Sequence, residues 1–207
     1  AIVAGQLPLA AGLALAQQYN DTDALTICFF GDGSTNQGLY HETMNLAAIW
    51  KLPVLFFLEN NMYGMGSSIE RVRAGGIDFY PGMATYGIPA AEVDGMDVLA
   101  VKEVTELAVA RIRNGDGPQF IEAKTFRFAG HSLADGQKYR AQEEVKEWEE
   151  RDPVATFPAK LIEMGLATSD QINQVKADVD EAVAIAVKFA EDSSEPELSE
   201  IYNDVLA

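Results

Sequence analysis

Two short polar segments carry the residue types that bind a divalent cation and a phosphate together. The first, Gly31-Asp32-Gly33-Ser34, directly follows the apolar residues 24–30 (ALTICFF). The second, residues 59–66 (ENNMYGMG), directly follows the apolar residues 53–58 (PVLFFL). Carboxylate and amide oxygens are hard ligands, which suit Mg²⁺ or Ca²⁺ and suit zinc poorly. The glycines beside them let the backbone turn sharply and come close to a ligand.

Asp32 and Asn61 are the two oxygen donors that we expect to meet. They lie about thirty residues apart, and the residues between them have the pattern of one helix followed by one strand. In a βαβ unit, such a connection returns the chain to a neighbouring strand at the same edge of the sheet. A magnesium ion held there would still accept the oxygens of a diphosphate. The backbone N–H groups of Gly33 and Ser34, just before the expected helix, could hold a phosphate oxygen.

A dinucleotide-binding loop, a calcium-binding EF-hand and an ordinary turn are the alternative interpretations of the first segment. The sequence from Gly31 to Asn36 lacks the third glycine of the GxGxxG fingerprint. The residues after Asp32 also lack the further acidic side chains of an EF-hand loop. A lone Gly-Asp-Gly is most often a turn, so the metal hypothesis depends on the whole pattern of strand, Gly-Asp-Gly, helix, strand and Asn-Asn.

The surrounding sequence predicts an α/β fold, with a parallel sheet covered by helices on both faces. Strands are expected at residues 24–30, 53–58 and 119–125, and helices at residues 6–19, 36–50 and 98–113. Residues 62–90 are rich in glycine and proline and are expected to be mainly loop. In such sheets, ligands bind beyond the carboxyl ends of the strands. That rule predicts that residues 31–36, 59–66 and 126–135 lie near a ligand.

The chain changes character after residue 140. Polar amphipathic helices are expected at residues 143–151, 154–164 and 169–190, with Gly165 as a C-cap and Thr168 or Ser169 as an N-cap. No linker separates this part, so we predict a ligand-binding α/β domain over residues 1–140. Residues 141–207 are then a helical extension packed on that domain.

Composition excludes several classes of protein. The net charge of −17, with 15 basic and 32 acidic residues, argues against a nucleic-acid surface. No apolar run is long enough to span a membrane. The one cysteine, Cys28, lies in an apolar run and is interpreted as a packed core residue, without a disulfide or zinc framework. A field this negative does not attract anions, so any phosphate must be held by local groups.

Longer motifs resemble one family. Gly-Asp-Gly followed by Asn-Asn resembles the thiamine diphosphate motif, and the wider sequence resembles the α subunits of E1 components of 2-oxoacid dehydrogenases, of the pyruvate and acetoin type. The matching segments, which together cover nearly the whole chain, are IVAGQLP (2–8), GDGSTNQG (31–38), NLAAIWKLPV (45–54), ENNMYGMG (59–66), VDGMD (93–97), RFAGHS (127–132), YR (139–140) and RDP (151–153). The family's α subunit begins over a hundred residues earlier, so we expect the N-terminal part to be missing here.

The resemblance implies a role for each matching residue. Mg²⁺ would be bound by the side chains of Asp32 and Asn61 and by the backbone carbonyl of Tyr63. Residues implied to contact thiamine diphosphate directly are Ala1 and Val3 at the aminopyrimidine, Gly33 and Ser34 at the diphosphate, and Met65 as the apolar residue that bends the cofactor. Plain core filling is the alternative interpretation of Met65, and the resemblance favours the contact with the cofactor.

His131 is the residue that we assign to catalysis. It follows an expected strand in a glycine-containing loop and matches an active-site histidine of the family, where it would stabilise the reacting carbonyl or transfer a proton. Ala129 stands where the family often has another polar residue, so a paired-histidine site is not expected. His41, inside an expected helix, is interpreted as structural. Ser132 matches a serine that is phosphorylated in animal versions, and we expect no kinase in a bacterial one.

The implied enzyme decarboxylates pyruvate, or cleaves acetoin, and passes the acyl group to a lipoyl-bearing E2 partner. It would act only with a β subunit, as an α2β2 heterotetramer, in the bacterial cytoplasm or, less expected, the mitochondrial matrix. A branched-chain 2-oxoacid enzyme and a non-catalytic subunit of the same fold are alternatives. A transketolase-like enzyme is disfavoured by Arg151-Asp152-Pro153 and by the helical C-terminal third.

Overall fold

The computed structural model describes residues 2–203. Ala1, one of the residues expected to contact a cofactor, lies outside the described residues. The chain divides into two compact units, residues 1–156 and residues 157–207, and each is described by itself. The domain division expected at residue 140 stays a prediction.

The first unit is built on a parallel sheet of four strands in the order β1-β2-β6-β5. The strands are β1 (Thr26–Gly31), β2 (Val54–Asn60), β5 (Ala90–Asp94) and β6 (Gln119–Lys124). Their register aligns Gly31 with Glu59, and Asn60 with Lys124. The carboxyl ends of β1, β2 and β6 therefore meet at one edge of the sheet.

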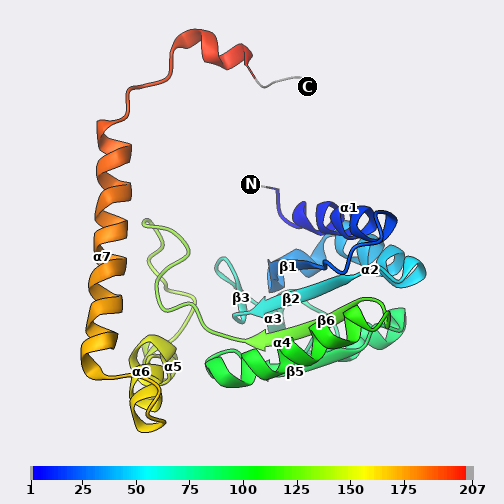
Figure 1. Cartoon of the computed structure of the whole chain (residues 1–207), viewed down its shortest axis with the longest axis horizontal. Coiled ribbons are helices and arrows are strands. Elements are labelled where there is room, and N and C mark those ends of the chain that lie inside the picture. The colour runs from blue at the N-terminus through cyan, green and yellow to red at the C-terminus, as the bar shows by residue number, and fades with distance from the viewer. Residues whose placement is uncertain (1, 204–207) are drawn as a thin grey trace. The chain divides into compact units, whose positions relative to one another are not determined.

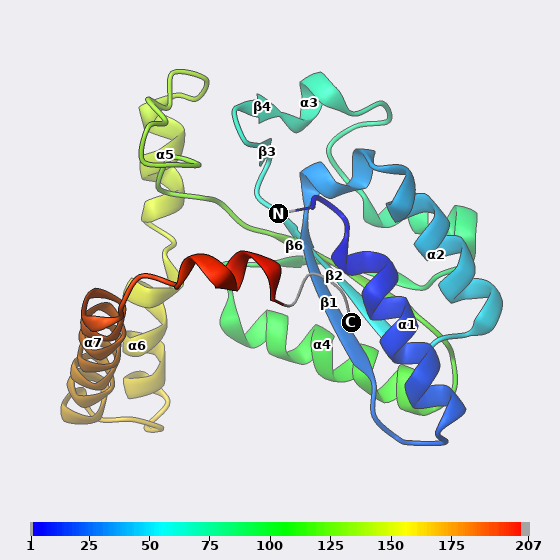
Figure 2. The same ribbon diagram turned by 90° about the horizontal axis from the view of Figure 1, so that it is seen from above.

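Helices cover both faces of this sheet, as Figures 1 and 2 show: α1 (Gln6–Tyr19) and α2 (Gly38–Trp50) lie on one face and α4 (Val98–Arg113) on the other. Successive side chains of a strand point to opposite faces. Phe56 of β2 accordingly belongs to the core beneath α1 and α2, and Phe57 to the core beneath α4. Cys28 is buried in the first of these cores, as expected for a packed residue.

The sequence predicted most of these elements. All three expected strands exist, and the helices expected at residues 6–19 and 98–113 have those bounds. The second helix starts at Gly38 and not at Asn36, because a 3₁₀ turn, η1 (Asp32–Asn36), precedes it. The fourth strand, β5, was not predicted. The expected loop region contains the hairpin β3 (Tyr63–Gly64) and β4 (Ser67–Ser68), and the short helices α3 (Ile69–Val72) and η2 (Tyr80–Tyr86).

The C-terminal helices also follow the sequence closely. They are α5 (Gln142–Glu149), α6 (Pro153–Glu163), α7 (Ser169–Asp192) and the 3₁₀ turn η3 (Leu198–Tyr202). Thr168 caps α7 in a capping box with Gln171, and Gly165 adopts a left-handed conformation after α6. Within residues 2–203, no helix is long and apolar enough to cross a membrane.

Phe56 tests the packing of the central strand. Its side chain is fully buried, whereas Phe29, on the edge strand β1, is 55% exposed. Phe56→Ala should lower the free energy of unfolding by about 3–5 kcal/mol, because it removes a large side chain and leaves a cavity. Phe29→Ala is the matched control and should cost less than half as much. Urea denaturation of both variants measures the difference, and equal losses would contradict the placement of β2 at the centre.

Candidate functional site

A cavity of about 600 Å³ lies at the edge where the strands end. In Figure 2 the hairpin β3–β4, α3 and the loop before α5 all lie beyond this end of the sheet. Eight of the nine residues expected to bind cofactor or act in catalysis line the cavity, namely Val3, Asp32, Gly33, Ser34, Asn61, Tyr63, Met65 and His131. They come from four separate segments of the chain, which the fold brings together. Their individual roles stay predictions.

Asp32 begins the 3₁₀ turn η1 directly after β1. It is only 3% exposed, although it is acidic and lines the cavity. The hydroxyl of Thr35 donates a hydrogen bond of 2.8 Å to the backbone carbonyl of Asp32 and closes the turn. Burial raises the pKa of the Asp32 carboxyl, against the opposing effects of the backbone N–H groups of Asp32 and Asn61 and of the charge of Arg127. A cation beside this carboxylate would compensate the cost of its burial.

Asn61 lies in a tight turn after β2. The side-chain oxygen of Asn60 accepts a hydrogen bond from the N–H of Met62 at 3.1 Å, and that of Asn61 accepts one from the N–H of Tyr63 at 3.2 Å. Met62 takes a left-handed backbone conformation within this turn, with φ of 68°. A carbonyl oxygen has a second lone pair, so the amide oxygen of Asn61 keeps one for a further partner.

Two glycines bring the two turns together. A Cβ atom on Gly33 would lie 3.6 Å from the Cα of Gly64, so the backbones of η1 and β3 are in van der Waals contact. Both glycines line the cavity. Neither glycine places a side chain beside Asp32, which permits a close approach by a ligand.

The buried carboxylate of Glu122 holds the turn that begins at Asn60. Glu122 of β6 is 0% exposed. It accepts hydrogen bonds from the side chain of Asn60 at 2.6 Å, from the N–H groups of Phe79 and Tyr80 at 2.7 and 2.8 Å, and from Lys124 at 2.7 Å. Burial lowers the pKa of Lys124, but its bonds to Asp78 and Glu122 outweigh that effect and raise it. The network ties the residues before η2 to the strand that precedes Asn61.

Arg127 is a functional candidate whose role the sequence did not predict. It lies directly beyond β6, in the segment 126–135 that we expected to be near a ligand, and it lines the cavity. Its guanidinium donates to the carbonyl of Met65 at 2.9 Å and to the hydroxyl of Tyr139 at 2.8 Å. It also contacts Nδ1 of His131 at 3.3 Å. The signals in the sequence were its position after a strand and its place in the matching segment RFAGHS (127–132), but its contact with Met65 spans 62 residues and could not be seen there.

The contact with Arg127 sets the tautomer of His131. A guanidinium has only donors, so Nδ1 of His131 is the acceptor and the neutral ring carries its proton on Nε2. The backbone N–H of His131 donates to Asp135 at 2.7 Å, and the Tyr139 hydroxyl donates to the same carboxylate oxygen at 2.7 Å. The Asp135 carboxylate thus holds the histidine loop in place, and Nε2–H is left to donate to a ligand.

A second arginine closes the same loop. Arg140 donates hydrogen bonds to the carbonyls of Arg127, Phe128 and Ala129. It also lies over the ring of Phe126, which stacks on Trp148 of α5 at 5.4 Å. Arg140 thus gives each of these three backbone carbonyl groups a hydrogen-bond partner.

The donors in the cavity fit a magnesium diphosphate. Within residues 2–203, no three His, Cys, Asp or Glu side chains cluster as in a zinc site. The lining offers one carboxylate, that of Asp32, together with neutral oxygen donors such as the amide of Asn61, glycine backbone and the guanidinium of Arg127. Mg²⁺ prefers such a small number of oxygen donors, with water and phosphate oxygens completing its shell.

Comparisons with known proteins show the family of the chain. The model of the family described as "Dehydrogenase E1 component" matches residues 1–199. The chain therefore belongs to the dehydrogenase E1 component family.

Several curated relatives match along the chain. The pyruvate dehydrogenase E1 component subunit alpha of Rhizobium meliloti is 44% identical over 206 residues, which are 99% of this chain and 59% of that protein. The Porphyra purpurea protein of the same name is 39% identical, over 97% of this chain and 60% of that protein. The human somatic mitochondrial form is 41% identical, over 97% of this chain and 51% of that protein. The chain thus spans between 51% and 60% of the length of these relatives.

One solved structure is also similar. It is described as that of a candidate thiamin diphosphate-dependent enzyme from Mycobacterium smegmatis, and it is 24% identical with a TM-score of 0.45. The match covers 58% of this chain and 22% of that chain.

Glu122→Gln tests whether the buried carboxylate of Glu122 holds the surrounding loops. The amide nitrogen cannot accept the hydrogen bonds that one carboxylate oxygen accepts, so at least one buried donor loses its partner. We expect a loss of about 1–3 kcal/mol in the free energy of unfolding, measured with urea. Glu92→Gln is the control, because its half-exposed carboxylate lies 3.7 Å from the same Lys124 and should change stability by less than about 0.5 kcal/mol. Equal losses of unfolding free energy in the two variants would mean that the hydrogen bonds of Glu122 do not hold these loops.

Asp135 tests the loop that carries His131. The Tyr139 hydroxyl and the backbone N–H groups of Gln137 and His131 lower the pKa of Asp135 to about 2. Its contribution to stability should therefore be complete above the usual carboxyl pKa of about 3.9 and be lost as the pH falls towards 2. NMR titration of the side chain measures this pKa. Tyr139→Phe should raise it towards the usual value, whereas the exposed control Tyr19→Phe should not. A pKa that stays near 2 in Tyr139→Phe would contradict the assignment.

Proposed function

We propose that this chain is the diphosphate- and magnesium-binding part of the α subunit of an E1 component that decarboxylates pyruvate. One observation carries the proposal: residues from four separate segments, chosen from sequence motifs alone, line a single cavity at the carboxyl edge of the sheet. The relatives that match along almost the whole chain, and that carry the name pyruvate dehydrogenase E1 component subunit alpha, support it.

The residues of the first two turns would hold the cofactor. Asp32, the amide oxygen of Asn61 and the backbone carbonyl of Tyr63 would bind Mg²⁺, and the backbone of Gly33 and Ser34 would hold the diphosphate. When bound, thiamine diphosphate supplies the electron sink that lets a carbon–carbon bond next to a carbonyl break. The two glycines at the contact between η1 and β3 support this assignment, because neither places a side chain beside Asp32.

The apolar residues of the cavity would position the rest of the cofactor. Val3, together with Ala1, is assigned to the aminopyrimidine, and Met65 to the bend of the cofactor. Met65 lines the cavity but is 64% exposed, and its carbonyl is held by Arg127. Its backbone is thus fixed, while its side chain is free to pack against a ligand.

His131 and Arg127 would act on the substrate. With Nδ1 occupied by Arg127, the Nε2–H of His131 can donate to a carbonyl oxygen and stabilise negative charge that develops there. Arg127 supplies a positive charge that would attract the carboxylate of a 2-oxoacid. Acetoin, which has no carboxylate, would not use that charge, and this favours pyruvate over acetoin. The relatives that carry the name pyruvate dehydrogenase E1 component subunit alpha favour pyruvate over a branched-chain 2-oxoacid.

The proposed reaction needs further protein. A β subunit would complete the site in an α2β2 assembly, and a lipoyl-bearing E2 would receive the acyl group. Phosphorylation of Ser132 is not part of the proposal. Relatives occur in a bacterium and, as mitochondrial forms, in animals. We place this chain in a bacterial cytoplasm.

Asp32→Asn tests the metal assignment. It keeps the shape of the side chain but removes its charge, so the affinity for thiamine diphosphate with Mg²⁺ should fall at least about tenfold. Calorimetry on the chain assembled with a matching β subunit measures the affinity. Asp23→Asn, at an exposed position in the same unit, is the control for charge alone. An unchanged affinity in Asp32→Asn would show that the metal assignment is wrong.

An activity assay on the same assembly tests the reaction. Pyruvate-dependent reduction of a dye should require both thiamine diphosphate and Mg²⁺. Dye reduction in the absence of thiamine diphosphate would contradict the proposed E1 function.

A further inference from the structure

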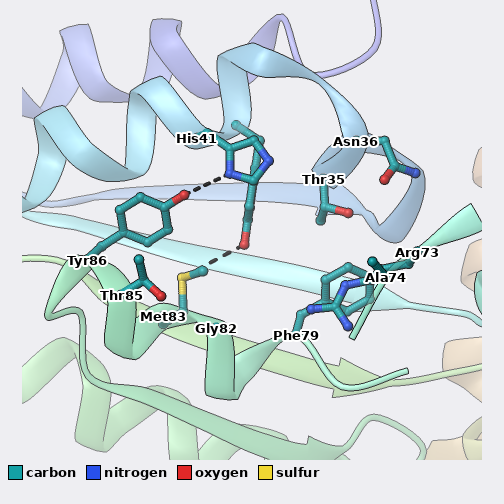
Figure 3. Close-up of a pocket in the computed structure, with 11 residues that line it drawn as sticks. Thr35, Asn36, His41, Arg73, Ala74, Phe79, Gly82, Met83, Thr85 and Tyr86 are labelled. Atoms are coloured by element: carbon teal, nitrogen blue, oxygen red, sulfur yellow. Dashed lines mark hydrogen bonds between the residues drawn. The ribbon is translucent and has the colours of Figure 1, made fainter. Parts of the chain in front are cut away.

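A second cavity lies behind the η1 turn, between the start of α2 and residues 73–86 (Figure 3). Its volume is about 310 Å³, so it can hold a small molecule. Figure 3 shows Arg73 and Phe79 towards one end, and His41 and Tyr86 towards the other. The proposed cofactor uses none of these four residues.

Arg73 gives this cavity a positive charge. Its guanidinium lies 4.0 Å above the centre of the Phe79 ring and donates one hydrogen bond to the carbonyl of Gly76. A guanidinium has five N–H donors, so most remain for another partner. Among the described residues, no carboxylate forms an ion pair with Arg73, and no acidic residue lines the cavity.

The opposite end offers neutral polar groups. Nδ1 of His41 and the hydroxyl of Tyr86 are 2.7 Å apart. Asn36 and Thr85 add an amide and a hydroxyl to the lining. Within the described part of the chain, Nε2 of His41 has no hydrogen-bond partner. The cavity thus combines one cation, several hydrogen-bonding groups and the rings of Tyr40, Phe79 and Tyr86.

We infer that this cavity binds a small organic oxyanion, with a carboxylate or phosphate head on Arg73 and an apolar body against Phe79 and Tyr86. A metal cation would find no anionic ligand there. A wholly apolar ligand would bury the guanidinium without a partner, which is costly. An oxyanion instead accepts the free N–H groups of Arg73 in a charge-assisted, bidentate arrangement.

This site would be in contact with the first cavity through η1. Asn36 lines both cavities, and Thr35, in the wall of the second, donates the 2.8 Å hydrogen bond to the carbonyl of Asp32. An occupant of the second cavity would therefore touch the turn that carries Asp32. Binding at the second site does not require the first to be a cofactor site, so the two proposals can fail separately.

The two histidines of the chain provide the test, because His41 lines the second cavity and His131 lines the first. The full chain, in whatever assembly it forms, is labelled with ¹³C in its histidine rings. It is then titrated with acetate, benzoate or inorganic phosphate at constant pH and ionic strength. We expect saturable shifts of the His41 resonances, larger at equal concentration for benzoate than for acetate, while His131 responds less.

Two variants decide the outcome. Arg73→Gln should weaken binding at least about tenfold, since it removes the charge-assisted bonds. Arg71→Gln makes the same charge change at an exposed residue that does not line the cavity, and it should leave the affinity unchanged. His41 shifts that do not saturate, or that persist unaltered in Arg73→Gln, would overturn the inference. Shifts of His131 alone would place the anion in the first cavity and overturn it equally.

Discussion

The burial of β2 on both faces is the constraint on which the rest of the structure depends. Its side chains alternate between two separate cores, so a slip of one residue would exchange the residues that pack beneath α1 and α2 with those beneath α4. The register with β1 and β6 is therefore fixed. That register brings Gly31, Asn60 and Lys124 to the same edge. The three polar segments leave the sheet together because the apolar core permits only one alignment.

The fully buried Glu122, on strand β6, holds the loops in a fixed position relative to the sheet. An unpaired carboxylate in the core would be very unfavourable, so its presence requires the donors that surround it. Those donors include Asn60, which sets the turn of Asn61, and the N–H of Phe79, whose ring lies under Arg73. One carboxylate thus positions a wall of each cavity. It acts through the side chain of Asn60 on one loop and through the backbone N–H of Phe79 on the other, and it lines neither cavity.

The sequence predicted those parts of the fold whose signal is local. Gln6–Tyr19 and Val98–Arg113 are long helices, and the apolar runs before Gly31 and Glu59 are strands of the sheet. The strand β5 (AAEVD) escaped prediction because only Val93 in it is buried, and its pairing with β6 depends on tertiary contacts.

The same distinction holds for the site. Asp32, Asn61 and His131 could be selected because each follows an apolar strand closely. Arg127 follows a strand as well, but its partners Met65 and Tyr139 lie 62 and 12 residues away. Glu122 was predicted only as part of the strand at residues 119–125, since the N–H groups that hold it belong to residues more than forty positions distant. Long-range hydrogen bonds leave no periodic pattern in the sequence.

The strongly negative net charge of the chain is physically compatible with the guanidinium group that lines each of the two cavities. At physiological ionic strength the screening length is about 8 Å, so the many exposed carboxylates contribute little to the field inside a cavity farther away than that. Arg127 and Arg73 act at hydrogen-bond distance, where screening is weak and the local dielectric is low. Recognition of an anion is therefore decided by one guanidinium and its neighbouring N–H and O–H groups. The net charge of −17 acts mainly on the rate of approach, which should slow at low salt.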